Sequence, residues 1–204
     1  MILECYTHSH TQYLEGVEMN TERMLIDANH AEAVKMVLDY LELNRERLTR
    51  PWPETSFPRP ELYIETEVPY NYYGSRGFVD IVEYRKNAFI SSSELDRTRF
   101  HPGDILTLWE IKSALRNIGE TLRQMHQAQK IFLLANRTIG NKSFNDRRID
   151  VYSALAFPNT DLNLTVFNAH KVLFQDHTSI IYTIDKETPH SLKTLMICGR
   201  EAQT

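Results

Sequence analysis

The sequence predicts an α/β domain in which a mixed central β-sheet is flanked by helices. Residues 105–112 are strand-forming and carry apolar side chains on both faces, which is typical of a central strand. Two strand patterns precede this run, and amphipathic helical patterns at residues 30–48 and 113–135 lie on either side of the strands. A chain of 204 residues is long enough for one domain with a substantial core.

The N-terminal part is predicted to contain one helix and one extended connector. The helix over residues 30–48 is indicated by an apolar stripe that consists of Val34, Val37, Leu38 and Leu41. Asn29 is its predicted N-cap, and Glu32 stands three residues later, as in a capping box. Residues 49–60 hold four of the eight prolines, so we expect an extended connector there.

The strands follow the connector. Residues 61–68 and 77–84 have the alternation of strands, and a hairpin loop is predicted between them at residues 69–76. Residues 85–104 are expected to form a long connection to the central strand. After the helix over 113–135, the sequence predicts a strand at 149–157, a short helix at 161–170 and strands at 179–184 and 192–198. We therefore expect a single domain over residues 1–204, with a core at about 30–157 and a C-terminal α/β extension at 158–204.

Charged residues interrupt two of the predicted strands. Glu110 and Lys112 are two positions apart, so their side chains project from the same face of the strand, about 6–7 Å apart. Asp80 interrupts the preceding strand and can reach Glu110 if the two strands pair. Two neighbouring carboxylates repel, and at least one should have a raised pKa. A divalent cation would relieve the repulsion, and a lysine beside it could orient a water molecule.

These residues resemble the PD-(D/E)XK nuclease superfamily, and above all its RecB-like and restriction-endonuclease-like branches. The likeness covers about residues 60–157 and consists of Gly-Phe-Val-Asp80, Trp-Glu110-Ile-Lys112-Ser and a helix with Arg123-Gln124. There are three departures from the pattern. Val79 stands where a proline is usual, Asp80 and Glu110 are 30 positions apart, and residues 127–131 hold no tyrosine.

The resemblance implies a restriction-endonuclease-like core and hydrolysis of phosphodiester bonds, most plausibly in DNA, with Mg²⁺ or Mn²⁺ as cofactor. Asp80 and Glu110 would hold the metal with the Ile111 carbonyl, Lys112 would position the water, and Gln124 would orient Lys112 or the phosphate. Glu32 would join the metal site from the first helix, although a helix cap explains it equally well. Glu65 and Glu67 are weaker metal candidates on an edge strand.

Four basic residues beside the predicted site are candidate phosphate contacts for a nucleic acid, and they are Arg116, Arg123, Arg147 and Arg148. The net charge of −4 argues against a protein that coats nucleic acid nonspecifically. A zinc cluster at Cys5, His8 and His10 lacks a convincing fourth ligand, so a polar segment is expected instead.

Composition predicts a cytoplasmic protein. No apolar run approaches the length of a membrane span, no signal peptide is visible, and Cys5 and Cys198 are expected to be free thiols.

Two alternatives to the nuclease remain. In the first, Asp80, Glu110 and Lys112 form a structural ion cluster, and in the second, the chain is a catalytically silent nuclease fold that acts in a DNA-processing complex. The sequence is compatible with DNA or RNA as the substrate, with any sequence specificity, with endo- or exonuclease action, and with a homodimer.

Overall fold

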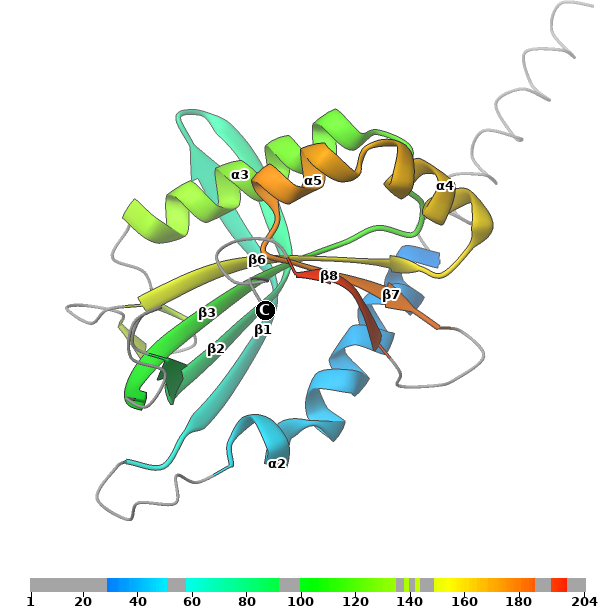
Figure 1. The fold of residues 1–204 in the computed structure, drawn as a ribbon. Coiled ribbons are helices and arrows are strands. Elements are labelled where there is room, and N and C mark those ends of the chain that lie inside the picture. Colours follow the sequence, from blue (N-terminus) through cyan, green and yellow to red (C-terminus); the bar gives the residue numbers. More distant parts are fainter. Residues whose placement is uncertain are drawn as a thin grey trace, which may run out of the picture.

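The protein is described here by a computed structural model that covers residues 29–50, 58–91, 100–134, 138–139, 142–143, 149–185 and 192–197. Its centre is a six-stranded mixed sheet with the strand order β1-β2-β3-β6-β7-β8. Helices cover both faces, with α3, α4 and α5 on one side and the helix at residues 29–43, followed by α2, on the other (Figure 1). The predicted α/β class, with a mixed sheet between helices, is confirmed.

The first three strands form an antiparallel meander, and these are β1 (Glu61–Tyr72), β2 (Ser75–Ser91) and β3 (Phe100–Ile111). The next two run parallel to β3, and they are β6 (Ile149–Pro158) and β7 (Ile180–Ile184). β8 (Leu192–Ile197) closes the sheet antiparallel to β7, so the predicted C-terminal extension adds strands to the same sheet. Two-residue strands β4 (Thr138–Ile139) and β5 (Lys142–Ser143) form a separate pair.

The parallel pairs require crossovers, which the helices supply. The helix α3 (Ile118–Leu134) joins β3 to β6, and the helices α4 (Asp161–Ala169) and α5 (Lys171–His177) join β6 to β7. The predicted helix over 113–135 starts later than expected, because the Asn117 side chain accepts a hydrogen bond from the backbone N–H of Glu120 and caps the helix. Residues 112–117 form an irregular segment between β3 and α3.

The predicted helix over 30–48 is divided into two. It runs from residue 29 to 43, breaks at Asn44, and continues as α2 (Arg45–Leu48). The Asn44 side chain and the Asn44 backbone N–H both donate to the Tyr40 carbonyl at this point. Asn29 is already helical, so the prediction that it caps this helix is wrong.

The first hairpin is longer than the sequence pattern predicts. Residues 69–72 continue β1, and the turn consists of Tyr73 and Gly74, whose φ angles of 47° and 87° suit a two-residue hairpin turn. β2 likewise extends to Ser91 and β3 begins at Phe100, so most of the predicted connection 85–104 is strand, and residues 92–99 lie outside the described part. The sequence pattern did not predict this extension, because the register of β2 against β3 shifts between Arg85 and Ala88 and interrupts the regular alternation.

β3 is buried on both faces, as its sequence predicts. Leu106 and Leu108 belong to the core on the side of α3, together with Ala128. Trp109 and Ile111 belong to the opposite core, where the helix at 29–43 inserts Ala33, Val37 and Leu41. A third cluster packs under α4 and α5 around Phe157, Phe167 and Phe174. Within the described residues, no helix is long and apolar enough to cross a membrane.

Candidate active site at the end of the central strand

The charged residues of β2 and β3 meet where β3 ends. The two strands pair antiparallel, with Ile81 opposite Trp109, so Asp80 and Glu110 occupy the next positions on neighbouring strands. The Asp80 carboxylate accepts a hydrogen bond from the Ile111 backbone N–H at 2.6 Å. The predicted pairing of the strands that carry the two carboxylates is therefore confirmed.

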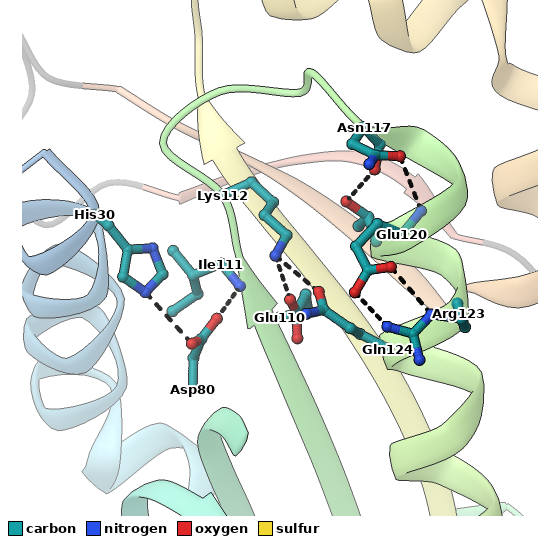
Figure 2. A network of polar contacts seen from close by, with 10 residues as sticks. His30, Asp80, Glu110, Ile111, Lys112, Asn117, Glu120, Arg123 and Gln124 are labelled. Carbon is teal, nitrogen blue, oxygen red and sulfur yellow. Dashed lines mark hydrogen bonds and ion pairs between the residues drawn. The ribbon is translucent and has the colours of Figure 1, made fainter. Parts of the chain in front are cut away.

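Glu110 lies on the side of α3. Its Oε1 atom is 2.5 Å from Lys112 Nζ, and the same ammonium group donates to Gln124 Oε1 at 3.0 Å. Gln124 comes from the second turn of α3, so the helix holds the lysine against the strand end (Figure 2). The hydrogen bond brings Gln124 to Lys112, and the role of Gln124 in orienting the lysine stays a prediction.

Asp80 turns toward the other face of the sheet. Its Oδ1 atom lies 3.4 Å from His30 Nε2, and His30 belongs to the helix at residues 29–43 (Figure 2). The pairing of β1 with β2 is interrupted opposite Asp80, at Glu67, whose φ of 51° lies in the left-handed region. The regular alternation predicted for β2 is broken there, because Val79 and Val82 both pack in the core on the α3 side. Asp80 and Glu110 thus share the end of β3 but have partners from opposite helix layers.

His30 is a site residue that the sequence analysis did not find. It lies three and seven positions before Ala33 and Val37, which are buried, so it continues the buried face of the helix. A histidine on an otherwise apolar helix face was the signal that could have identified it. Glu32, the residue predicted to join the metal site, is exposed and is rotated about 200° around the helix from His30.

Burial and neighbouring charges set the electrostatics of the site. Burial, and then the charge of Asp80, raise the pKa of Glu110 to about 7, and Lys112 opposes this rise. The raised pKa predicted for one of the two carboxylates is therefore found on Glu110, which is 8% exposed. The pKa of His30 is also raised, mainly by its hydrogen bond to Asp80.

The donor set would suit a hard divalent cation only in part. Among the described residues, no group of three or more His, Cys, Asp or Glu side chains is close enough together to hold a metal ion. Two carboxylates and a backbone carbonyl would leave most of an octahedral shell to water, as expected for Mg²⁺. After burial, the charge of Asp80 is the second cause of the raised pKa of Glu110, and a cation near both carboxylates would lower that pKa.

A buried tyrosine adds to the site from β1. Tyr70 is 5% exposed, and burial followed by the nearby charge of Glu110 raises its pKa. Its ring lies over Gly77, where an added Cβ would come within 2.5 Å of the ring atoms. Glycine at this position therefore lets the tyrosine lie flat across the hairpin beside the carboxylate.

The other predicted residues are distributed as follows. Arg123 is exposed and forms an ion pair with Glu120, and it also donates to Gln127. Arg116 is exposed in the segment before α3. Glu65 is partly buried and Glu67 is exposed, both on the edge strand β1. Arg147 and Arg148, the two cysteines Cys5 and Cys198, and the segment with His8 and His10 lie outside the described residues.

Comparisons with known proteins add no assignment. No family model matches the chain, and neither a curated protein nor a solved structure matches it.

Proposed function

We propose that the chain is a metal-dependent nuclease that hydrolyses phosphodiester bonds in DNA. The observation that carries the proposal is the cluster at the end of β3, where Asp80 and Glu110 interact and Lys112 lies against Glu110 and Gln124. The order of three antiparallel strands, a helix and a parallel strand also supports the resemblance to the PD-(D/E)XK nucleases and a restriction-endonuclease-like core.

The residues have distinct roles in this proposal. Asp80 and Glu110 would hold Mg²⁺ or Mn²⁺ with the Ile111 carbonyl, and His30 would orient Asp80 or join the ligands. The bound cation would polarise the phosphate and lower the pKa of a bound water. Lys112 would hold the attacking water and stabilise the negative charge that develops on the phosphate. Gln124 would keep the ammonium group in place through the 3.0 Å hydrogen bond.

The nucleic acid would approach from the side of α3. Arg116 and Arg123 lie on or just before this helix and are exposed, so they could contact phosphates. Arg123 would exchange its ion pair with Glu120 for a phosphate, since exposed ion pairs contribute little stability. Arg147 and Arg148 remain candidates for the same role.

A catalytically silent nuclease fold is the second candidate. The observation in its favour is that both oxygens of Asp80 and the ammonium of Lys112 already have partners within the chain. Such a protein would bind nucleic acid or a processing complex without cleaving.

The deciding experiment is cleavage of a panel of single- and double-stranded DNA and RNA, with Mg²⁺, with Mn²⁺ and with EDTA. We expect metal-dependent cleavage that falls by at least about two orders of magnitude in Lys112→Ala and Asp80→Asn, because each loses a group that acts in the transition state. Lys171→Gln, which removes one exposed positive charge on α5, serves as the matched control. Binding without cleavage in wild type, at any metal concentration, would favour the silent fold, and equal activity in all variants would reject the proposed site.

A further inference from the structure

A cavity on the other face of the sheet contains none of the residues assigned above. Its volume is about 870 Å³, in the range of small-ligand sites. It lies between the helix at residues 29–43 with α2 and the strands β2, β3 and β7. Its floor carries Trp109 and the buried Glu83, which is 3% exposed.

The lining is locally basic in a chain that is net acidic. Three arginines, Arg47, Arg50 and Arg85, surround the cavity, whereas Glu83 is its one carboxylate among the described lining residues. Both carboxylate oxygens of Glu83 are occupied: Arg85 Nε lies 3.1 Å from Oε1, and the Trp109 indole donates to Oε2 at 2.9 Å. Both oxygens of Glu83 are therefore engaged within the chain, and the three arginines give the cavity lining a net positive charge.

The arginines have nitrogen atoms left for an anion. Within the described part of the chain, Arg85 has Glu83 as its ion-pair partner through Nε, which leaves both terminal guanidinium nitrogens. Arg47 donates one hydrogen bond to the Tyr40 hydroxyl at 3.2 Å and is exposed. Guanidinium groups bind phosphate and carboxylate in a bidentate manner, so three of them around one cavity favour an anionic ligand.

The remaining lining favours a planar ring. Tyr182 stacks on Trp109 with ring centroids 5.0 Å apart, and Tyr40 lies on the helix across the cavity. Aromatic side chains that are partly buried offer flat apolar surface to a ligand ring. We propose that this cavity binds a small aromatic anion, a planar ring that carries a phosphate or carboxylate, with the arginines at the anionic group and Tyr40 and Tyr182 at the ring. This inference is independent of the proposed nuclease activity.

The test is calorimetric titration of the full chain in EDTA with four probes: AMP, phenyl phosphate, adenosine and inorganic phosphate. We expect AMP, phenyl phosphate or both to bind at least tenfold more tightly than either half-ligand, since ring and anion contacts act together. A preference for AMP over phenyl phosphate would identify a nucleotide site, and equal affinity would identify a site for simpler aromatic anions. In a Trp52→Phe background, the single remaining indole N–H resonance should shift on binding, because Trp109 forms the cavity floor.

The variants locate the site. Arg47→Gln combined with Arg50→Gln should lower the affinity at least tenfold, and both side chains are exposed, so the fold should survive. Arg85→Gln should lower the affinity further than the double variant does, and a thermal melting curve of this variant shows whether it folds. Lys171→Gln, with the same loss of charge on α5, should bind like wild type. The proposal is overturned by unchanged affinity in the double variant, by inorganic phosphate binding as tightly as AMP and phenyl phosphate, or by no binding of any probe at millimolar concentration.

Discussion

Two buried glutamates on neighbouring strands, Glu83 and Glu110, show how different partners change the same side chain. Burial is the main reason that the pKa of each is raised. Arg85 and the Trp109 indole then oppose the rise at Glu83, so both of its further influences stabilise the charge. At Glu110 the next influence is the charge of Asp80, which raises the pKa further, and Lys112 only partly offsets it.

The charge of Glu83 is thus compensated by partners within the chain, whereas the repulsion between Glu110 and Asp80 is only partly offset. Glu83 has one partner for each oxygen, and its neighbourhood contains an excess of arginines. Glu110 shares the end of a strand with a second acid, and the chain supplies one lysine to the pair. We therefore expect an external cation to affect the site at Glu110, and an external anion to affect the cavity beside Glu83.

The largest stability effect should come from removing Arg85, the positively charged side chain beside Glu83. Arg85→Ala leaves Glu83 buried without its ion-pair partner, which should lower the free energy of unfolding by about 3–5 kcal/mol at pH 8. The loss should become smaller as the pH falls, because the pKa of Glu83 is raised by burial and protonation removes the unpaired charge. Urea unfolding at pH 8 and at lower pH measures it.

Lys112→Ala is the matched variant on the other side of the sheet. It should cost less, and Mg²⁺ should restore part of the loss, because a bound cation can offset the charge of Glu110 in place of the ammonium group. Equal losses in the two variants, with no effect of Mg²⁺ on either, would remove the distinction between the two glutamates.

The pH dependence of stability should distinguish the two sites next. The folded chain holds a proton on Glu110 up to a pKa of about 7, whereas the unfolded chain releases it near the ordinary value of 4.5. Between these values the folded state binds more protons, so metal-free stability falls as the pH rises, by at most about 3 kcal/mol from this group. Asp80→Asn or saturating Mg²⁺ should flatten the fall, as followed by urea unfolding from pH 4.5 to 8.

His30 contributes to the same profile in the same direction. Its pKa is raised, so its stabilising contact with Asp80 is fully present below pH 6.5 and is lost as the pH rises through the folded pKa. His30→Gln should therefore reduce the fall above pH 6.5, where Glu110 still contributes up to its pKa of about 7, and leave the part below pH 6.5 unchanged. A fall that persists unchanged in both Asp80→Asn and His30→Gln would have to come from elsewhere, for example from Glu83.

A smaller effect is expected at the indole that bonds Glu83. Trp109→Phe keeps a buried aromatic ring but removes the 2.9 Å hydrogen bond to the carboxylate, which should cost about 1–3 kcal/mol and raise the pKa of Glu83 further. A double-mutant cycle with Glu83→Gln isolates the coupling between the two side chains. Zero coupling would mean that the bond does not compensate the carboxylate.

The smallest stability effect is expected at Gln124. Gln124→Ala removes a half-buried hydrogen bond to Lys112 and should cost less than about 1 kcal/mol. If the proposed nuclease activity is present, cleavage should nevertheless fall at least about tenfold, because the lysine loses its support from α3. Gln129→Ala, further along the same helix, is the control, and an equal effect of both changes on cleavage would speak against a positioning role.

Local patterns were sufficient to predict most of the elements. The alternation of apolar side chains around Trp109 and Ile111 predicted a central strand, because a strand covered on both faces needs apolar residues at every position. The two-residue spacing of Glu110 and Lys112 placed both side chains on one face of β3 for a similar reason, whereas the break in the alternation of β2 at Asp80 could not be predicted in this way. The start of the second helix at Ser113 was predicted incorrectly, because the side-chain hydrogen bond of Asn117 caps α3 at a later position. Asn29 was wrongly predicted as a cap, since it is already helical.

The sequence by itself determined the α/β order of elements and the two acidic strands, since both depend on periodicity within short segments. Only the tertiary structure brought His30 to Asp80, turned Asp80 and Glu110 toward different helix layers, and assembled the cavity of Arg47, Arg85 and Tyr182. These contacts join segments that are far apart in the chain, and no local pattern encodes which distant side chain will lie beside a given carboxylate. The packing of helix 29–43 and α3 on opposite faces of one sheet decided them.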